Sequence, residues 1–347
     1  MSEQSYVPIN GGTENRSDYG TITRDSEGVL RNPDGTVWSP LSTEQVAFSW
    51  KLYVGFLFSL FLLWQGYEWS SHLPHKLPKG RETPDFPFEG ESNFMVDTEA
   101  YNTLSVIVNT TAAITNIQIL TNGSEDTKSI HITSAIFTDD SRNLHFKQTT
   151  EEDRYILALN SNGADVHATA TIQIVLPASQ LSLNNLDILL ATGTVNGSAL
   201  THSQFDKLNV KVDEGTITFK DVRGSHINLQ TSIGDITGTF SIDQMYSAIS
   251  NQGHIDCRLR VPAHSTPDIS LGTSVGNVTA RVTDTFRGPF SLFTKRGHAY
   301  VFGSRYIDFF TNTTTAKNGV FREDNADSNI SMYSQQGRVV LAFKRNV

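Results

Sequence analysis

The hexapeptide Thr231-Ser-Ile-Gly-Asp-Ile236 decides the fold, because variants of it recur along the C-terminal half of the chain. Ser250-Asn-Gln-Gly-His-Ile255 and Thr273-Ser-Val-Gly-Asn-Val278 follow the same order: Thr or Ser, a glycine three residues later, a polar residue, and Ile or Val. Glycines recur at a nearly constant interval of about 20 residues, so one structural unit repeats. The eight glycines on this spacing are Gly193, Gly215, Gly234, Gly253, Gly276, Gly297, Gly319 and Gly337.

Apolar residues occupy fixed positions around these glycines. Leu229 and Leu271 stand five residues before a glycine, and Ile217, Ile236 and Val278 stand two residues after one. Apolar and polar positions in register predict a strand, a tight turn that needs glycine, and a second strand, with the units stacked on one another. The predicted fold class is all-β: a parallel β-helix or β-solenoid-like repeat domain of about 20 residues per coil.

The composition limits the classes of function. The 347-residue chain has a net charge of −9, which argues against a nucleic-acid partner, because phosphates demand a surplus of Lys and Arg. A single cysteine excludes an internal disulfide framework and a multi-cysteine zinc site. Cys257 falls in an apolar column four residues after Gly253, so we expect a small buried side chain there rather than a reactive thiol.

The N-terminal region reads as a tail followed by a membrane anchor. Residues 1–45 are rich in Ser, Thr, Asn, Asp and Gly without an apolar period, which predicts a disordered cytosolic tail. Residues 46–67 form an apolar segment with aromatic residues at both ends, and a helix of that length spans about 33 Å. We therefore predict a single-pass transmembrane helix that acts as a signal-anchor. A buried helix and a cleaved signal peptide are the alternatives.

Two signals disagree on the orientation of this anchor. Lys76, Lys79 and Arg81 follow it, which favours a cytosolic C-terminal side. Glycosylation sequons point the other way, since one precedes the segment and six follow it, and large domains translocate largely regardless of charge. We predict a luminal or extracellular C-terminal domain, in the plasma membrane or the secretory pathway. The six predicted acceptors are Asn109, Asn122, Asn196, Asn277, Asn312 and Asn329.

Three further segments complete the predicted organisation. Residues 68–93 carry four prolines and read as an extended stalk. Residues 94–187 alternate like strands and form the β-rich N-terminal part of the solenoid, and residues 188–347 form the glycine-turn repeats. Because the ends of a stack expose sheet edges, we expect caps in the region before Ile188 and in the irregular segment after Arg305.

The repeats resemble a known family. The apolar strand ending in Leu176-Pro177-Ala178 and the Thr/Ser-x-x-Gly-polar-Ile/Val turns are similar to the putative-adhesin repeat domains of bacteria and fungi, and the chain looks like a membrane-anchored fungal-type member. The resemblance covers about residues 94–345. It implies a β-solenoid-like fold, and it implies neither catalytic residues nor a cofactor. The segment from Arg305 to Asn325 departs from the pattern, which puts the continuity of the coils in question there.

Chemistry on the stack would depend on its polar columns. Residues of one column on adjacent coils lie about 4.8 Å apart, which would bring Asp235 beside His254. Such a pair could be a general base with its orienting group, or half of a metal site, but polarity at a turn needs no further cause. The acidic residues Asp213, Asp221 and Asp256 occupy different columns, without a repeated pair for glycoside hydrolysis. The serines and threonines of the turns are expected to satisfy backbone groups.

Three functions compete at this point. The first is a non-catalytic protein that displays the solenoid for adhesion or for binding glycan, cell-wall or protein partners. The second is a membrane-anchored carbohydrate-active enzyme on the same scaffold. The third is a trafficking protein of the secretory pathway, because Tyr6-Val-Pro-Ile9 and Tyr19-Gly-Thr-Ile22 match the form of endocytic sorting signals. We favour the first, with no cofactor, no metal and no nucleic acid, and with the lipid bilayer as a partner through the anchor.

Overall fold

The computed structural model is all-β in the residues that it describes, as the sequence predicted. The chain divides into two units, Met1–Leu77 and Pro78–Val347. In the first unit, β1 (Thr23–Arg24) and β2 (Leu30–Arg31) form an antiparallel pair. Within the described parts of the chain, no helix reaches the length and apolarity that a membrane span requires, and the predicted anchor at 46–67 lies outside those parts. The described residues are 23–24, 30–31, 86–87, 92–110, 113–122, 129–139, 143–161, 167–177, 182–198, 200, 203–303, 306–322 and 327–345.

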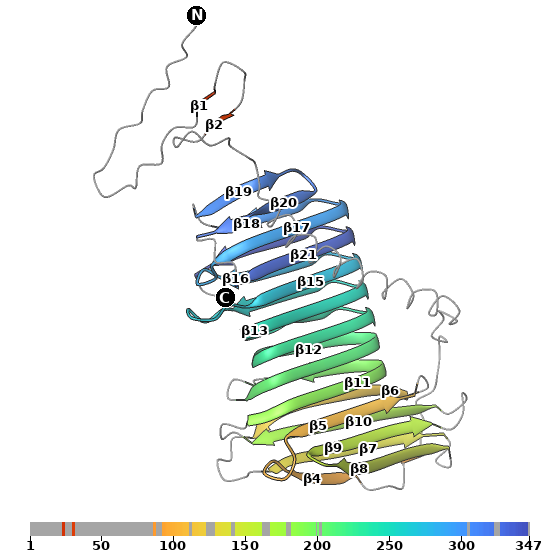
Figure 1. The fold of residues 1–347 in the computed structure, drawn as a ribbon. Helices are drawn as coiled ribbons and strands as arrows, with labels where there is room; N and C mark the ends of the chain where they lie inside the picture. The colour runs from red at the N-terminus through yellow and green to blue at the C-terminus, as the bar shows by residue number, and fades with distance from the viewer. Residues whose placement is uncertain are drawn as a thin grey trace, which may run out of the picture. The chain divides into compact units, whose positions relative to one another are not determined.

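The second unit contains one continuous sheet of 20 strands, β3 to β22 (Figure 1). Most of its strands are joined in parallel to strands one coil away, so that the sheet winds around a single core. The strands are β3 (Phe86–Pro87), β4 (Asn93–Asp97), β5 (Thr103–Asn109), β6 (Ala113–Asn122), β7 (Ser129–Thr138), β8 (Leu144–Glu151), β9 (Arg154–Ser161), β10 (Ala168–Pro177), β11 (Ser182–Gly197), β12 (Gln204–Ile233), β13 (Ile236–Gln252), β14 (Ile255–Arg260), β15 (Asp268–Val275), β16 (Val278–Thr283), β17 (Gly288–Arg296), β18 (Ala299–Phe302), β19 (Ile307–Asn312), β20 (Ala316–Phe321), β21 (Asn329–Gln336) and β22 (Val339–Lys344).

In the middle of the sheet, coils stack in the order of the chain. β11 pairs in parallel with β12, which brings Gly193 opposite Gly215, the next corner glycine in sequence. β12 pairs with β13 in the same way, so that Ile217 lies opposite Ile236, its equivalent in the following repeat. β13 pairs in parallel with β14 and with β15, and β14 pairs in parallel with β16. The repeat spacing of the glycines is therefore the sequence length of one coil.

Near the C-terminal end, the order of the coils departs from the order of the chain. β21 and β22, the last strands in sequence, pair with β15 and β16 on one side and with β17 and β18 on the other. Gly337 therefore lies between Gly276 and Gly297, not beyond Gly319. Gly319 belongs to β20, which runs antiparallel to β17 and β19, so its expected place at a corner of the repeat is wrong. Coils can stack out of chain order because they are joined by backbone hydrogen bonds, which any coil of the same shape can form.

The N-terminal end of the sheet shows a similar arrangement. The coil made by β5 and β6 pairs with β11 on one side and with the later strands β9 and β10 on the other. Beyond them, β8 runs antiparallel to β9, and β7 runs antiparallel to β10, β4 and β3. In Figure 1 these strands lie at the opposite end of the stack from β19 and β20. Antiparallel strands thus cover both ends, in the two regions where the sequence predicted caps.

Glycine is required at the corners because the coils approach each other too closely for any side chain. The backbone angle φ of Gly215, Gly234 and Gly253 lies between 143° and 158°, where residues with a Cβ are rare. A Cβ on Gly234 would lie 1.7 Å from the carbonyl oxygen of Gly215. The same clash, at 1.6 to 2.0 Å, recurs at seven corners: Gly193, Gly215, Gly234, Gly253, Gly276, Gly337 and Gly297.

The Thr or Ser three residues before each of the later corner glycines satisfies the backbone, as the sequence predicted. Ser250 Oγ donates a hydrogen bond of 3.0 Å to the Gly234 carbonyl, and Thr273 Oγ1 donates one of 3.0 Å to the Gly253 carbonyl. Both side chains are buried, so without this bond a buried hydroxyl would be left unpaired at a cost of about 1–3 kcal/mol. Thr231, Thr294 and Ser334 make the equivalent bond.

The interior of the coils is one apolar cluster. Cys257 is fully buried in it, which confirms the prediction for this residue. Its sulfur lies 3.0 Å from the hydroxyl of Tyr246, which is also fully buried. Burial raises the pKa of the Cys257 thiol to about 12 and raises the pKa of Tyr246 well above its usual value. Neither group carries a charge at neutral pH.

Candidate functional site

The polar column that follows the glycines is a chain of hydrogen bonds to backbone. Asp235 Oδ1 accepts a hydrogen bond of 2.6 Å from the backbone N–H of His254, and His254 Nδ1 accepts one of 2.9 Å from the N–H of Asn277. Asn277 Oδ1 in turn accepts one of 2.8 Å from the N–H of Arg338. Because Nδ1 is an acceptor, it carries no proton. The structure therefore brings Asp235 and His254 together. Each side chain accepts a hydrogen bond from a backbone N–H group, and the Asp235 carboxylate bonds to the His254 amide, not to its imidazole ring.

Acidic side chains on the segments that follow the corners are paired with arginines of other coils. Arg260 Nη1 lies 2.8 Å from Asp221 Oδ1, and Arg281 pairs with Asp256. Arg223 lies 3.6 Å from Asp243. These carboxylates serve as ion-pair partners across coils.

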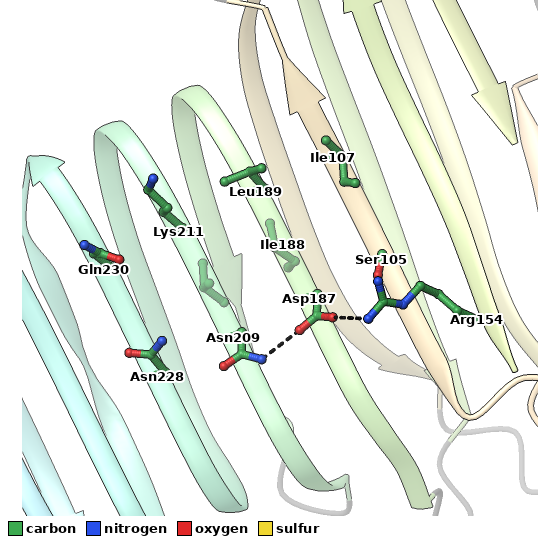
Figure 2. Close-up of a pocket in the computed structure, with 11 residues that line it drawn as sticks. Ser105, Ile107, Arg154, Asp187, Ile188, Leu189, Asn209, Lys211, Asn228 and Gln230 are labelled. Carbon is green, nitrogen blue, oxygen red and sulfur yellow. Dashed lines mark hydrogen bonds and ion pairs between the residues drawn. The ribbon is translucent and has the colours of Figure 1, made fainter. Parts of the chain in front are cut away.

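A groove of about 300 Å³ lies on the other outer face, over the segments that precede the corners (Figure 2). Strands β5, β9, β11 and β12 supply its lining. These strands belong to five neighbouring coils, because β12 contributes residues from two of them, and inward and outward positions alternate along each strand. The lining residues are Ser105, Ile107, Arg154, Asp187, Ile188, Leu189, Asn209, Val210, Lys211, Asn228 and Gln230.

A polar network runs across the groove. Asn209 Nδ2 donates a hydrogen bond of 2.8 Å to Asp187 Oδ1, and Arg154 Nη2 lies 3.7 Å from Asp187 Oδ2 (Figure 2). Arg154 and Lys211 are about half exposed, so both retain donors that face solvent. Ser105 is only 2% exposed, and its hydroxyl has no hydrogen-bond partner in the described structure.

The groove lies on two columns of side chains. Asp187, Asn209 and Asn228 stand six residues before a corner glycine, and Lys211 and Gln230 stand four before one. The groove was not predicted from the sequence, because the predicted repeat pattern was defined by the residue five positions before each glycine and by the first two residues after it. The polar residues six positions before each glycine were the signal that could have revealed it. Strand register extends that column from Asn228 through Ser247, Ser270, Ser331 and Ser291.

The predicted glycosylation acceptors differ in their exposure. Asn109, Asn196 and Asn312 are exposed. Asn277 and Asn329 are partly buried, and Nδ2 of Asn329, the atom that a glycan would modify, donates hydrogen bonds to Ser331 and Asp268. Asn122 is the last residue of β6.

No cluster of three or more His, Cys, Asp or Glu side chains in the described ranges is arranged to hold a metal ion. The groove itself has one carboxylate, Asp187, and no histidine or cysteine among its lining residues. Its chemistry is that of hydrogen bonding, with amide, hydroxyl, guanidinium and ammonium groups on a floor that contains Ile107 and Leu189.

Comparison with known proteins gives distant structural likenesses only. No family model matches the sequence, and no curated protein matches it. Among solved structures, a putative adhesin from Bacteroides fragilis is 12% identical with a TM-score of 0.33, over 73% of this chain and 96% of that one. A putative adhesin from Parabacteroides merdae is 9% identical with a TM-score of 0.31, over 73% and 95%. A putative cell adhesion protein from Clostridium sporogenes is 9% identical with a TM-score of 0.28, over 74% and 100%. Likeness at this level supports no conclusion about fold or function by itself.

Proposed function

We propose that this protein is a non-catalytic adhesion or binding protein, in which a β-solenoid presents the groove of Figure 2 to a glycan, cell-wall or protein partner. The observation that carries the proposal is the pair of outward columns that line the groove, with Asp187, Asn209 and Asn228 in one and Lys211 and Gln230 in the other. Repeating polar side chains at the coil spacing form an extended surface of the kind that repeat proteins use for binding.

The groups in the groove suit recognition better than catalysis. A glycoside hydrolase needs a second carboxyl group across the substrate, and Asp187 is the only carboxylate in the lining. Asp187 also accepts a hydrogen bond from Asn209 and faces Arg154, which holds it as an acceptor. Amide and guanidinium donors on a fixed sheet can order a polar ligand without reacting with it.

The membrane anchor and the orientation belong to the same proposal. We infer that residues 46–67 span the bilayer once and that the solenoid lies in the lumen or outside the cell, as a fungal-type member of the adhesin-like group would. The exposure of Asn109, Asn196 and Asn312 is compatible with glycans at these sequons. A C-terminal tag on the full chain in intact vesicles should resist protease until detergent is added, and glycosidase should increase the mobility of the protein. Digestion of the tag without detergent would refute this orientation.

The binding proposal is tested with the full-length protein in detergent. We expect wild-type protein to be retained on isolated cell walls, and the double variant Asp187→Ala/Asn209→Ala to be retained about tenfold less, because it removes the hydrogen-bonded pair in the groove. Thr218→Ala/Thr237→Ala is the matched control, because it removes a hydroxyl pair 3.1 Å apart on adjacent coils of the other outer face. Equal loss in both double variants, or no loss in either, would contradict a binding site in the groove.

A further inference from the structure

Gly272 is a glycine that the backbone does not require. It lies inside β15, away from the corners, and its φ is not among the positive values of the corner glycines. Its register is unbroken on both sides, opposite Ile249 of β13 and Tyr333 of β21. A Cβ built on Gly272 meets no other atom within 4 Å. Glycine weakens a strand, and in a strand interior it marks a bulge, a tight bend or the close approach of a ligand or another backbone. The unbroken register and the open space leave an approach from outside the sheet.

The column that contains Gly272 has a gap with an aromatic wall. Phe293 and Tyr333 lie opposite each other on β17 and β21, with ring centroids 5.9 Å apart and ring planes 12° from parallel. Gly272 is the next residue in this column and places no side chain over the Tyr333 ring. Ile249 lies on the far side of Gly272. Its backbone is two strand spacings, or about 9.6 Å, from the backbone of Tyr333, measured across the strands. One flat ring can occupy a space of this width between two side chains.

The rim of the gap is polar. Ser247, Ser270 and Ser331 belong to the neighbouring outward column, on the same three coils as Ile249, Gly272 and Tyr333. Ser274 lies on β15, two residues from Gly272, and faces outward in the same way. All four serines are partly exposed. An aromatic face with hydroxyl groups around it matches a sugar ring, whose C–H face is apolar and whose edge carries hydroxyls.

We propose that the gap at Gly272 is a stacking subsite for a pyranose ring of a linear polysaccharide. The ring packs against Tyr333 and takes the place of the missing side chain, and its hydroxyls meet the serine column. This inference rests on the proposed binding function and names its ligand class.

The test fills the gap without disturbing the fold. Gly272→Leu introduces a side chain into open space, so we expect the variant to melt at the same temperature as wild type or higher. Binding of the full-length protein is measured on insoluble cellulose, chitin and β-1,3-glucan, with Asp187→Ala/Asn209→Ala in parallel. We expect Gly272→Leu and Tyr333→Ala to weaken binding to the polysaccharide about tenfold, and Tyr333→Phe to retain it, because the phenyl ring still stacks. Thr279→Leu, on the other outer face of the same coil, is the control and should bind as wild type does.

The other outcomes separate this subsite from the proposed function. Polysaccharide binding that falls only in Asp187→Ala/Asn209→Ala would overturn the subsite and leave the groove as the binding site. Binding to none of the three polysaccharides would overturn the subsite, and retention on cell walls would then decide the proposed function alone. A protein partner whose binding is lost in Gly272→Leu, while polysaccharide binding is unchanged, would show that a protein contacts the gap and would overturn a sugar there.

Discussion

Between Ser182 and Thr283 each coil pairs with the next coil along the chain, whereas at both ends of the sheet a coil pairs with strands from far along the sequence. In the middle, partners belong to consecutive repeats, as Gly193 and Gly215 do. At the C-terminal end, β15 pairs with β21, although five strands lie between them in sequence. At the N-terminal end, β5 pairs with β9 and β11 and skips the strands that directly follow it. The coils pair in parallel in both regions, but the choice of neighbour differs.

This difference shows that the repeat encodes a shape and not an order. Each coil offers the same row of backbone donors and acceptors, so any coil with the same corner can pair with it. The ends add a second requirement, because an unpaired edge can join another chain. At one end β7 and β8 cover the outermost coil in antiparallel pairing, and at the other β20 and β19 do so. An inserted coil and a pair of antiparallel strands together complete each end.

The largest effect is expected for a disulfide crosslink between two coils that are neighbours in the structure but not in the sequence. Thr279 and Val340 lie opposite each other on β16 and β22, whereas Val340 separates Thr279 from Tyr300 of β18. Paired residues on adjacent strands lie about 4.8 Å apart at Cα, within the range of a disulfide, and residues two strands apart do not. We expect Thr279→Cys/Val340→Cys to form a disulfide on mild oxidation, detected by thiol labelling and mass spectrometry. Thr279→Cys/Tyr300→Cys is the control and should keep both thiols free. The reverse result would mean that the coils stack in chain order.

The next largest effect is expected at the corners. Gly234→Ala places a Cβ 1.7 Å from the Gly215 carbonyl oxygen, so we expect the free energy of unfolding to fall by about 3 kcal/mol or more, measured by urea denaturation. The variant for comparison is at Thr115 of β6, which lies opposite Gly193 at the start of the N-terminal end of the sheet. Its hydroxyl is buried without a partner in the described structure, so Thr115→Val should leave stability unchanged or raise it. Equal losses at both positions would contradict the distinction between middle and end.

The smallest effect depends on pH and concerns the interior of the middle coils. Burial raises the pKa of Cys257 from 9.0 to about 12 and raises that of Tyr246, so the folded protein holds both protons at a pH where the unfolded chain releases them. The stability is therefore fully present below about pH 9 and falls as the pH rises toward 12, by about 1.4 kcal/mol per pH unit for each group that titrates only when unfolded. Denaturation at pH 8, 9 and 10 measures this slope. Tyr246→Phe/Cys257→Ala should flatten it, and an unchanged slope in that variant would assign the titration to other groups.

The sequence predicted more of the fold than of the site. The corner glycines, the Thr or Ser before the later ones and the apolar columns are each fixed by contacts that recur from coil to coil, so their pattern can be recognised in the sequence. The signal at Gly319 was false, because a glycine at the right interval lies in β20, where its close neighbour is the Asp308 carbonyl of β19. The polar column with Asp235 and His254 was correctly placed at the turn, but its contacts to backbone amides were visible only in the structure.

The sequence by itself determined the coil: its length, its glycine corner, its hydroxyl bond to the carbonyl below and its inward face. These follow from local backbone geometry and from the alternation of side chains, which act within one unit and repeat with it. Only the tertiary structure decided which coils are neighbours at the ends, where Arg154 meets Asp187, and that Tyr333 borders the gap at Gly272. Backbone edges carry no residue identity, so hydrogen bonding alone cannot select a partner coil, and the selection depends on how the whole chain closes its exposed edges.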